Sequence, residues 1–334
     1  MTADDADRPG VLRGLLRRGE VMTALMLAVT LAALVPVALA TDTGRLFDAL
    51  GRTEAATIGA VLALALANYA LRVVRFDVFL RRLGMRLPAR AAATVYVAGF
   101  AMSATPGKVG ELLRLWLLRR AHGLAFRRTF PVLVADRAGD VMAMLLLCVA
   151  GLAAFADYAA AALPMAALWL AAVALLVQPR LLLRLVGRLY ALVGRRPRLF
   201  ARLRALLRAT AALFRPRPLA QGLVLGVAGW FCECVALYVC AATFSADITL
   251  LQAVFVFAFA NLVGGLTLVP GGIGGTEVTM VALLLAAGLD LDAAVATTTI
   301  VRLGTLWFGI ACGYVVLLSG LAGRRFAGDR EQAA

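Results

Sequence analysis

Two short motifs place charged residues beside Pro-Gly within apolar sequence. The first reads TPGKVGE, from Thr105 to Glu111, and the second reads LVPGGIGGTE, from Leu268 to Glu277. Each contains Pro-Gly, a further glycine and a glutamate at the start of the following helix. Proline cannot continue the hydrogen-bond ladder of a helix, and charged side chains are unfavourable in hydrocarbon. The motifs therefore predict two interrupted helices rather than two simple membrane spans.

The chemistry that such a break offers is the binding of a polar group at membrane depth. An irregular turn is tolerated there only where it is buried in protein or lines a water-filled cavity, and the helix that restarts after it directs free N–H groups into that cavity. Interruptions at corresponding positions of two halves indicate a substrate site near the midplane. The predicted backbone members of this site are Pro106, Gly107, Pro270, Gly271, Gly272, Gly274 and Gly275.

Charged side chains beside the breaks are candidates for contact with a lipid headgroup. Lys108 and Arg114 are expected to bind a phosphate. Glu111 and Glu277 have two interpretations: they cap the following helices, or they contact a cationic group or carry a proton. Arg114 follows Glu111 by three residues, so the two share a helix face and could form an ion pair, which could open for a ligand.

Further charges lie inside the apolar runs, where an unpaired charge costs about 2.5–3.5 kcal/mol on insertion scales. Arg302 lies near the middle of a run and is expected to face the cavity. Arg72 and Arg75 are expected to extend toward the cytoplasmic interface. ADRAGD, from Ala135 to Asp140, is expected to begin a helix at the interface, with gating as the alternative. The candidates for a proton or charge relay are Glu233, Asp136, Arg137 and Asp140.

Composition indicates the class of protein that carries these motifs. Of 334 residues, 63% are apolar, against about half in a soluble protein, and mean hydropathy is +0.89. A formal charge of +15 would suggest nucleic-acid binding in a soluble chain. Here the arginines cluster between apolar runs, as in cytoplasmic loops that face anionic lipid. The sequence therefore predicts an all-α polytopic membrane protein without a nucleic-acid partner, and its residues suggest no metal site or cofactor.

Eight apolar segments define the expected topology. Six are long enough to span about 30 Å of hydrocarbon: residues 21–41, 55–76, 138–156, 159–177, 219–243 and 293–320. Two more, 91–120 and 250–288, are each split by Pro-Gly. Arginines flank both sides of the first, and acidic residues follow the second, so the positive-inside rule predicts hairpins that re-enter from the cytoplasm and from outside, respectively.

The order of these segments predicts an inverted repeat. Each half has three spans and one re-entrant broken helical hairpin, and an odd number of crossings inserts the second half upside down. Both termini are then cytoplasmic. The expected boundaries are a tail at 1–20, a transmembrane domain at 21–320 with halves 21–156 and 159–320, and a tail at 321–334.

A basic segment at 179–218 interrupts the second half. It contains eleven arginines and no acidic residue, and Pro197 breaks it. The pattern predicts amphipathic helices on the anionic inner leaflet. The alternatives are a plain topology determinant or a docking surface for a lipid-modifying enzyme.

The chain resembles the lysylphosphatidylglycerol synthase transmembrane family, also called flippase-like domain proteins, over about residues 20–320. The resemblance rests on PGKVGELLRLWLL, ADRAGD, VPGGIGGTEVTMVALLLAAG and ATTTIVRLGTLWFGIACG. Larger members add a cytosolic aminoacyl-transferase domain, which is absent from this sequence. The resemblance thus implies the lipid-translocating part without the synthase. It does not identify the lipid, which is expected to be a phospholipid, a glycolipid or an isoprenoid lipid.

Together these features predict a flippase or transporter of the bacterial inner (plasma) membrane that moves a polar lipid headgroup through a cavity between the halves. The chain has no P-loop motif, so a gradient would supply the energy, or transport would be passive. One alternative is a membrane enzyme acting on a lipid headgroup, although the sequence offers no nucleophile–base set and an enzyme is not expected. The other is a non-transporting scaffold for a lipid-modifying enzyme.

Overall fold

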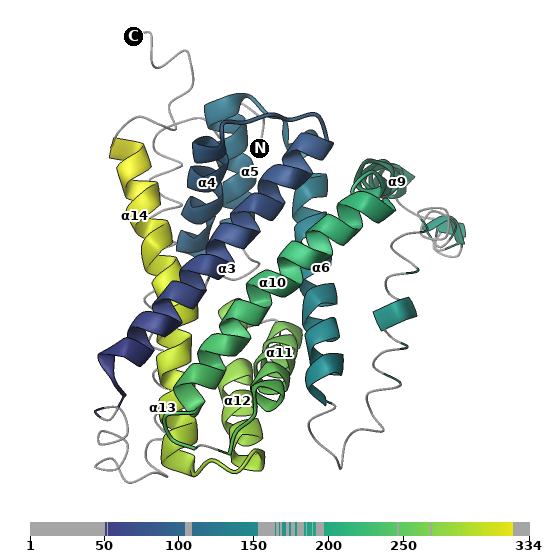
Figure 1. Cartoon of the computed structure of the whole chain (residues 1–334). Coiled ribbons are helices and arrows are strands. Elements are labelled where there is room, and N and C mark those ends of the chain that lie inside the picture. The colour runs from purple at the N-terminus through teal and green to yellow at the C-terminus, as the bar shows by residue number, and fades with distance from the viewer. Residues whose placement is uncertain are drawn as a thin grey trace.

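The chain forms a bundle of helices (Figure 1). The computed structural model describes residues 51, 53–103, 109–152, 197–245, 247–267 and 269–322, with scattered positions between 164 and 191. All regular secondary structure in these residues is helical, which confirms an all-α polytopic membrane protein. The predicted span 21–41 and most of 159–177 lie outside the described residues.

Long helices run from one end of the bundle to the other in the described part of the chain (Figure 1). They are α3 (Ala55–Arg82), α6 (Phe126–Leu152), α10 (Pro216–Ala241), and a last helix made of α13 (Leu291–Arg302), the π-helical turn η6 (Leu303–Trp307) and α14 (Phe308–Ala322). The first, the third and the last are long and apolar enough to cross a membrane. The α6 helix starts 12 residues before the predicted span 138–156 and continues through Pro131.

Two helical hairpins lie between the long helices and open toward opposite ends of the bundle (Figure 1). The first consists of α4 (Ala89–Ala98) with the 3₁₀ turn η2 (Gly99–Met102), and α5 (Val109–His122). The second consists of α11 (Leu250–Leu266), the turn η5 (Pro270–Gly272) and α12 (Gly275–Ala286). The predicted segments 91–120 and 250–288 are therefore each a pair of short helices, and their re-entrance in a membrane stays a prediction.

Glycine makes the second break possible. Gly271, Gly272 and Gly274 have φ values of 68°, 68° and 85°, in the left-handed region that other residues rarely adopt. The chain therefore reverses within a few residues between α11 and α12. The backbone groups of this turn stay close to the side chains of α12 and α13, which is where the second candidate site lies.

The two long helices α3 and α10 make the most extensive contact between elements. On α10 the contact face consists of glycines one turn apart, which lets the backbones approach as in other membrane helix pairs. These are Gly222, Gly226 and Gly229, which lie against the α3 side chains Phe79, Arg75 and Asn68.

A tight contact also joins α14 to the first hairpin, because Gly313 lies directly on the backbone of Phe100 and Ala101. A Cβ at this position would overlap with the Ala101 backbone, so Gly313→Ala is expected to cost about 1–3 kcal/mol of stability. The measurement is the thermal unfolding midpoint of the purified protein in detergent. Gly59→Ala on α3 is the control, since its Cβ would meet no atom within 4 Å and alanine favours helix by about 0.5–1 kcal/mol. A Gly313→Ala protein as stable as the wild type would contradict this packing.

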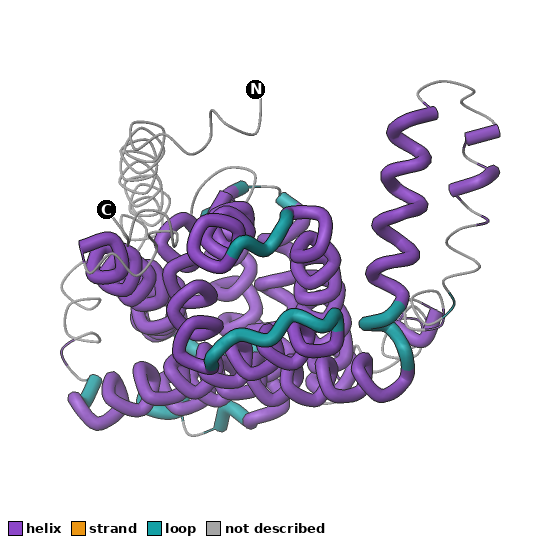
Figure 2. Tube along the Cα trace, turned by 90° about the horizontal axis from the view of Figure 1, so that it is seen from above, coloured by secondary structure: helices purple, strands orange, loops and turns teal. Residues whose placement is uncertain are grey.

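The basic segment is described from Pro197 onward. Its helix α9 (Pro197–Ala211) begins at the predicted break and packs against α6. It is seen end-on at the upper right of Figure 1, and it projects to the side of the bundle in Figure 2. Most of the predicted helix before Pro197 lies outside the described residues.

Candidate functional site

A cluster of ionised side chains lies buried between α3 and α6. Arg75 is fully buried, and its Nη2 lies 2.5 Å from Asp136 Oδ1 and 2.6 Å from Asp140 Oδ1. Arg72, almost one turn earlier on α3, donates from Nη2 to Asp140 Oδ2 at 3.1 Å and from Nε to the Tyr96 hydroxyl at 3.1 Å. The prediction that both arginines extend to the interface is wrong, because the two aspartates neutralise them inside the bundle.

The position of the two aspartates contradicts a second prediction. ADRAGD does not begin a helix, since α6 starts at Phe126 and the motif lies more than two turns inside it. Asp136 and Asp140 are four residues apart, so they share the helix face that meets α3. Both are buried, and the Trp230 side chain of α10 also donates to Asp140, at 3.0 Å. The motif is thus a buried binding face for arginines rather than a helix terminus.

Arg137 connects this cluster to the helix that follows the first break. Its Nη1 lies 3.2 Å from Glu111 Oε1 of α5, and its Nη2 lies 2.9 Å from both Asp136 Oδ2 and Asp140 Oδ2. A single guanidinium therefore bridges α5 and α6. Movement of the first hairpin relative to α6 would have to break the contact with Glu111.

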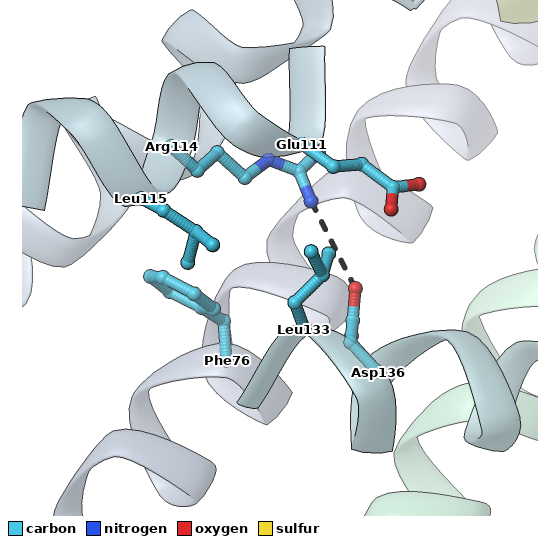
Figure 3. Close-up of a pocket in the computed structure, with 6 residues that line it drawn as sticks. All are labelled: Phe76, Glu111, Arg114, Leu115, Leu133 and Asp136. Atoms are coloured by element: carbon cyan, nitrogen blue, oxygen red, sulfur yellow. Dashed lines mark ion pairs between the residues drawn. The ribbon is translucent and has the colours of Figure 1, made fainter. Parts of the chain in front are cut away.

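Arg114 enters the same cluster from α5. Its Nη1 lies 3.8 Å from Asp136 Oδ2, the ion pair drawn in Figure 3, and its Nε donates to the Tyr96 carbonyl at 3.1 Å. The guanidinium carbon lies 3.8 Å from the centre of the Tyr96 ring, a cation–π contact. The predicted Arg114–Glu111 ion pair is not formed, because Arg114 turns toward Tyr96 and Asp136 while Glu111 pairs with Arg137.

The space beside these residues is small. A cavity of about 10 Å³ lies next to Glu111, Arg114 and Asp136, as Figure 3 shows. That is about the room that one water molecule needs, and far less than a lipid headgroup needs. Among the described residues, this cavity beside the arginine–carboxylate cluster, which we call the first site, therefore has no room for a headgroup.

The second site joins the second break to the last long helix. Arg302 Nε donates to Glu277 Oε1 at 2.6 Å, and Arg302 Nη2 donates to the Gly271 carbonyl at 2.9 Å. Glu277 Oε2 accepts a hydrogen bond from Gly274 N at 2.7 Å, so this carboxylate caps α12 and forms an ion pair at the same time. Arg302 is buried and faces the break itself.

The two sites correspond to one another along the chain. Each break is followed by a glutamate that pairs with an arginine of the next long helix, and the separations are similar: 26 residues for Glu111–Arg137 and 25 for Glu277–Arg302. Both arginines are followed by any residue and then glycine, Gly139 or Gly304. Sequence reasoning missed this pairing, although the shared Arg-x-Gly at matching distance from each glutamate is the signal that would have found it.

Pro270 begins the turn η5, and the remaining predicted residues divide into three groups. Pro106, Gly107 and Lys108 lie outside the described residues. Gly272 and Gly275 lie close to the α11 backbone at Gly264, as expected of a compact turn. Glu233 belongs to neither ion-pair site, because the side-chain amide of Asn68 donates a hydrogen bond to it. The described residues contain no group of three or more His, Cys, Asp or Glu side chains that could hold a metal ion.

Comparison with known proteins gives a consistent result. The family model described as "Lysylphosphatidylglycerol synthase TM region" matches residues 23–313. A UPF0104 membrane protein of Methanothermobacter thermautotrophicus is 24% identical over 318 residues, which cover 88% of this chain and 94% of that protein. A second match to a UPF0104 membrane protein of the same organism is 30% identical over 92 residues, 28% of each chain.

Proposed function

Because the chain belongs to the lysylphosphatidylglycerol synthase transmembrane region family, we propose that it is a lipid flippase or transporter that moves a polar headgroup between the leaflets. The observation that carries the proposal is the pair of corresponding ion pairs, Glu111–Arg137 and Glu277–Arg302, beside the two breaks. Buried charges within membrane helices are costly and are typical of substrate pathways. Breaks at corresponding positions of two halves are typical of transporter binding sites.

The charge of the first site favours an anionic group of the lipid, such as its phosphate. Four guanidinium groups face three carboxylates in this cluster, namely Arg72, Arg75, Arg114 and Arg137 against Glu111, Asp136 and Asp140. One positive charge is therefore left over if all seven are ionised. Arginine binds phosphate through two parallel hydrogen bonds. In our proposal the phosphate takes the place of a glutamate on Arg137 or Arg302, and the hairpin that carries this glutamate is released.

This exchange of phosphate for glutamate gives a transport cycle in which the lipid is moved but not chemically altered. While both ion pairs are formed, the site is closed and polar groups cannot pass. A headgroup that breaks one ion pair opens one side, and motion of the two halves against each other then exposes the site to the other leaflet. The acyl chains stay in the bilayer throughout, as their apolar surface requires.

We also propose a plasma-membrane location with both termini in the cytoplasm. The basic end of α3, the α5–α6 connection and α9 lie toward the upper end of the bundle in Figure 1. The acidic residues Asp247, Asp290 and Asp292 flank the starts of α11 and α13, toward the lower end. The positive-inside rule then puts the upper end in the cytoplasm, next to anionic inner-leaflet lipid.

The proposal is tested by reconstituting the protein into phosphatidylcholine–phosphatidylglycerol vesicles with a fluorescent phospholipid, and in parallel with a fluorescent glycolipid. We expect the protein to speed the movement of at least one probe between leaflets, which is read as quenching by an added impermeant reductant. Mass spectrometry of the recovered lipids should show unchanged masses. Vesicles that behave like protein-free vesicles with both probes would overturn the proposal, and a changed lipid mass would favour the enzyme alternative.

A further variant distinguishes the scaffold alternative from lipid transport. Deleting residues 197–208 removes most of α9. If this segment recruits an enzyme and the bundle does not transport, the deletion abolishes complex formation and the wild type shows no probe movement. Our proposal expects probe movement in both proteins, because α9 lies beside the bundle (Figure 2).

A further inference from the structure

One buried carboxylate differs from the others in how it is neutralised. Glu233 of α10 is 6% exposed, close to Asp136, Asp140 and Glu277 in its burial. Those three each form an ion pair with an arginine. Among the described contacts, Glu233 has instead a hydrogen bond from the Nδ2 of Asn68, a neutral side chain of α3. Glu233 therefore lacks the direct ion pair that its counterparts have among the described residues.

The side chain of Asn68 is only partly hydrogen-bonded in its contact with Glu233. This residue is fully buried, and its Oδ1 has no hydrogen-bond partner, although buried polar atoms are nearly always paired. Gly229, about one turn before Glu233 on α10, leaves room for this oxygen, since a Cβ there would lie 2.8 Å from it. A carboxylic acid and a primary amide side by side form two hydrogen bonds, amide N–H to acid C=O and acid O–H to amide C=O. A proton on Glu233 would supply the donor that Asn68 Oδ1 lacks.

The cations near Glu233 in the described part of the chain are paired with other carboxylates and do not contact it directly. The charged and titratable groups around it are Arg72 and Tyr69 of α3, Asp140 of α6, Arg302 of α13, and Cys232 and Cys234 of α10. Of the two cations, Arg72 is bound to Asp140 and Arg302 to Glu277. Tyr69 donates its hydroxyl to the Thr305 carbonyl. In the closed state, therefore, neither of these two guanidinium groups forms an ion pair with Glu233.

We propose that Glu233 is a proton-binding site and that protons are the coupling ion of this protein; the coupling rests on the proposed lipid transport, whereas the proton site does not. In the closed state Glu233 is a neutral acid that holds α10 to α3 through Asn68. When the site opens to water, the carboxyl O–H bond breaks, the electron pair stays on the oxygen and the proton passes to a water molecule. The new carboxylate then competes with Asp140 for Arg72.

The position of Arg72 links the proton to the first site. Arg72 lies one turn after Asn68, and its guanidinium carbon is 4.7 Å from the centre of the Trp230 ring on α10. It is thus placed between Asp140 of α6 and the α10 face that carries Glu233. A shift of Arg72 toward ionised Glu233 removes one of the guanidinium groups that hold α6 to α3. Proton loss and opening of the first site are therefore expected to occur together.

The proton site is tested by infrared spectroscopy of the purified protein at neutral pH in a maltoside detergent, which has no ester carbonyl that absorbs where a carboxylic acid does. We expect a carbonyl stretch of a protonated carboxylic acid that is lost in Glu233→Gln and kept in Glu54→Gln, a change at an exposed glutamate. Glutamine can form the same two hydrogen bonds with Asn68, so Glu233→Gln should fold, and an unchanged unfolding midpoint checks this. A band of equal size in wild type and Glu233→Gln, or no such band in the wild type, would overturn the proton site.

Coupling is tested in the reconstituted vesicles, with potassium and valinomycin to hold the voltage at zero. An imposed pH gradient is expected to change the wild-type rate of probe movement several-fold and to leave the rate of Glu233→Gln unchanged. Equal wild-type rates with and without the gradient would overturn coupling while lipid transport stands. A wild type that moves no probe would overturn the proposed function, and the infrared result would still decide the proton site.

Discussion

Replacing Arg75 with alanine will lower the free energy of unfolding by about 3–5 kcal/mol, the typical cost of removing one partner of a buried ion pair. Arg75 is fully buried and contacts both Asp136 and Asp140 at 2.5–2.6 Å. Its loss leaves two carboxylates facing each other with less positive charge to balance them. The measurement is equilibrium unfolding of the purified protein in mixed micelles, followed by circular dichroism.

The control for this prediction lies on the same helix. Arg81 is about half exposed and pairs with Asp77 four residues earlier, at 2.7 Å. Exposed pairs of this kind contribute about 0.3–0.5 kcal/mol, so Arg81→Ala should change stability by less than about 1 kcal/mol. Similar losses for Arg75→Ala and Arg81→Ala would contradict the buried cluster. Adding Asp136→Asn to Arg75→Ala should recover part of the stability, because the double variant leaves less charge unpaired.

Removing the charge of Glu277 is expected to slow lipid movement by about tenfold to a hundredfold. In the proposed cycle the Glu277 carboxylate displaces the phosphate from Arg302 and so releases the lipid, a step that neutral glutamine performs poorly. A hydrogen bond to a charged group contributes about 1.5–3 kcal/mol, and each 1.4 kcal/mol corresponds to about tenfold in rate. Glu277→Gln keeps the acceptor for Gly274 N but loses the charge that holds Arg302. The rate is measured with the fluorescent probes in vesicles. Asp247→Asn, in an exposed loop, is the control and should transport like the wild type.

A double variant separates transport from folding at this site. Glu277→Gln together with Arg302→Gln removes both charges, so no unpaired charge remains and stability should lie near that of the wild type. Transport should stay as low as in the single variant if the ion pair takes part in the cycle. Wild-type rates in Glu277→Gln, or full recovery of transport in the double variant, would show that the pair only supports the fold. Parallel loss in Glu111→Gln is expected at the corresponding pair.

The helical elements could be predicted because their signals are local. Pro270 and the glycines after it marked the second break, and Pro197 marked the start of α9. The positions of the buried arginines could not be predicted in the same way. Arg75 and its partner Asp136 are 61 residues apart, and positive charge near the end of an apolar run normally indicates an interface. The pairing of α3 with α6 decides the outcome, and run length and composition contain no information about it.

The same reason explains the two other corrections. A glutamate and an arginine three residues apart on α5 are good partners in an isolated helix, but Tyr96 and Arg137 from neighbouring elements offer better ones. ADRAGD contains enough charge to end a span in isolation, and it is stable inside α6 because arginines of α3 face it. In both cases contacts between helices outweigh the preference of the local sequence.

The glycine face of α10 bears on how the two halves can move. Helices that interlock through large side chains must disengage ridges from grooves before they can turn. At Gly222, Gly226 and Gly229 the α10 surface is nearly smooth, so α3 meets backbone there instead of protruding side chains. When the two helices turn at this crossing, the side chains that must shift there are therefore those of α3. In the absence of lipid, the resistance to alternation then comes from the ion pairs at the hairpins, which are the groups that a charged lipid is able to exchange.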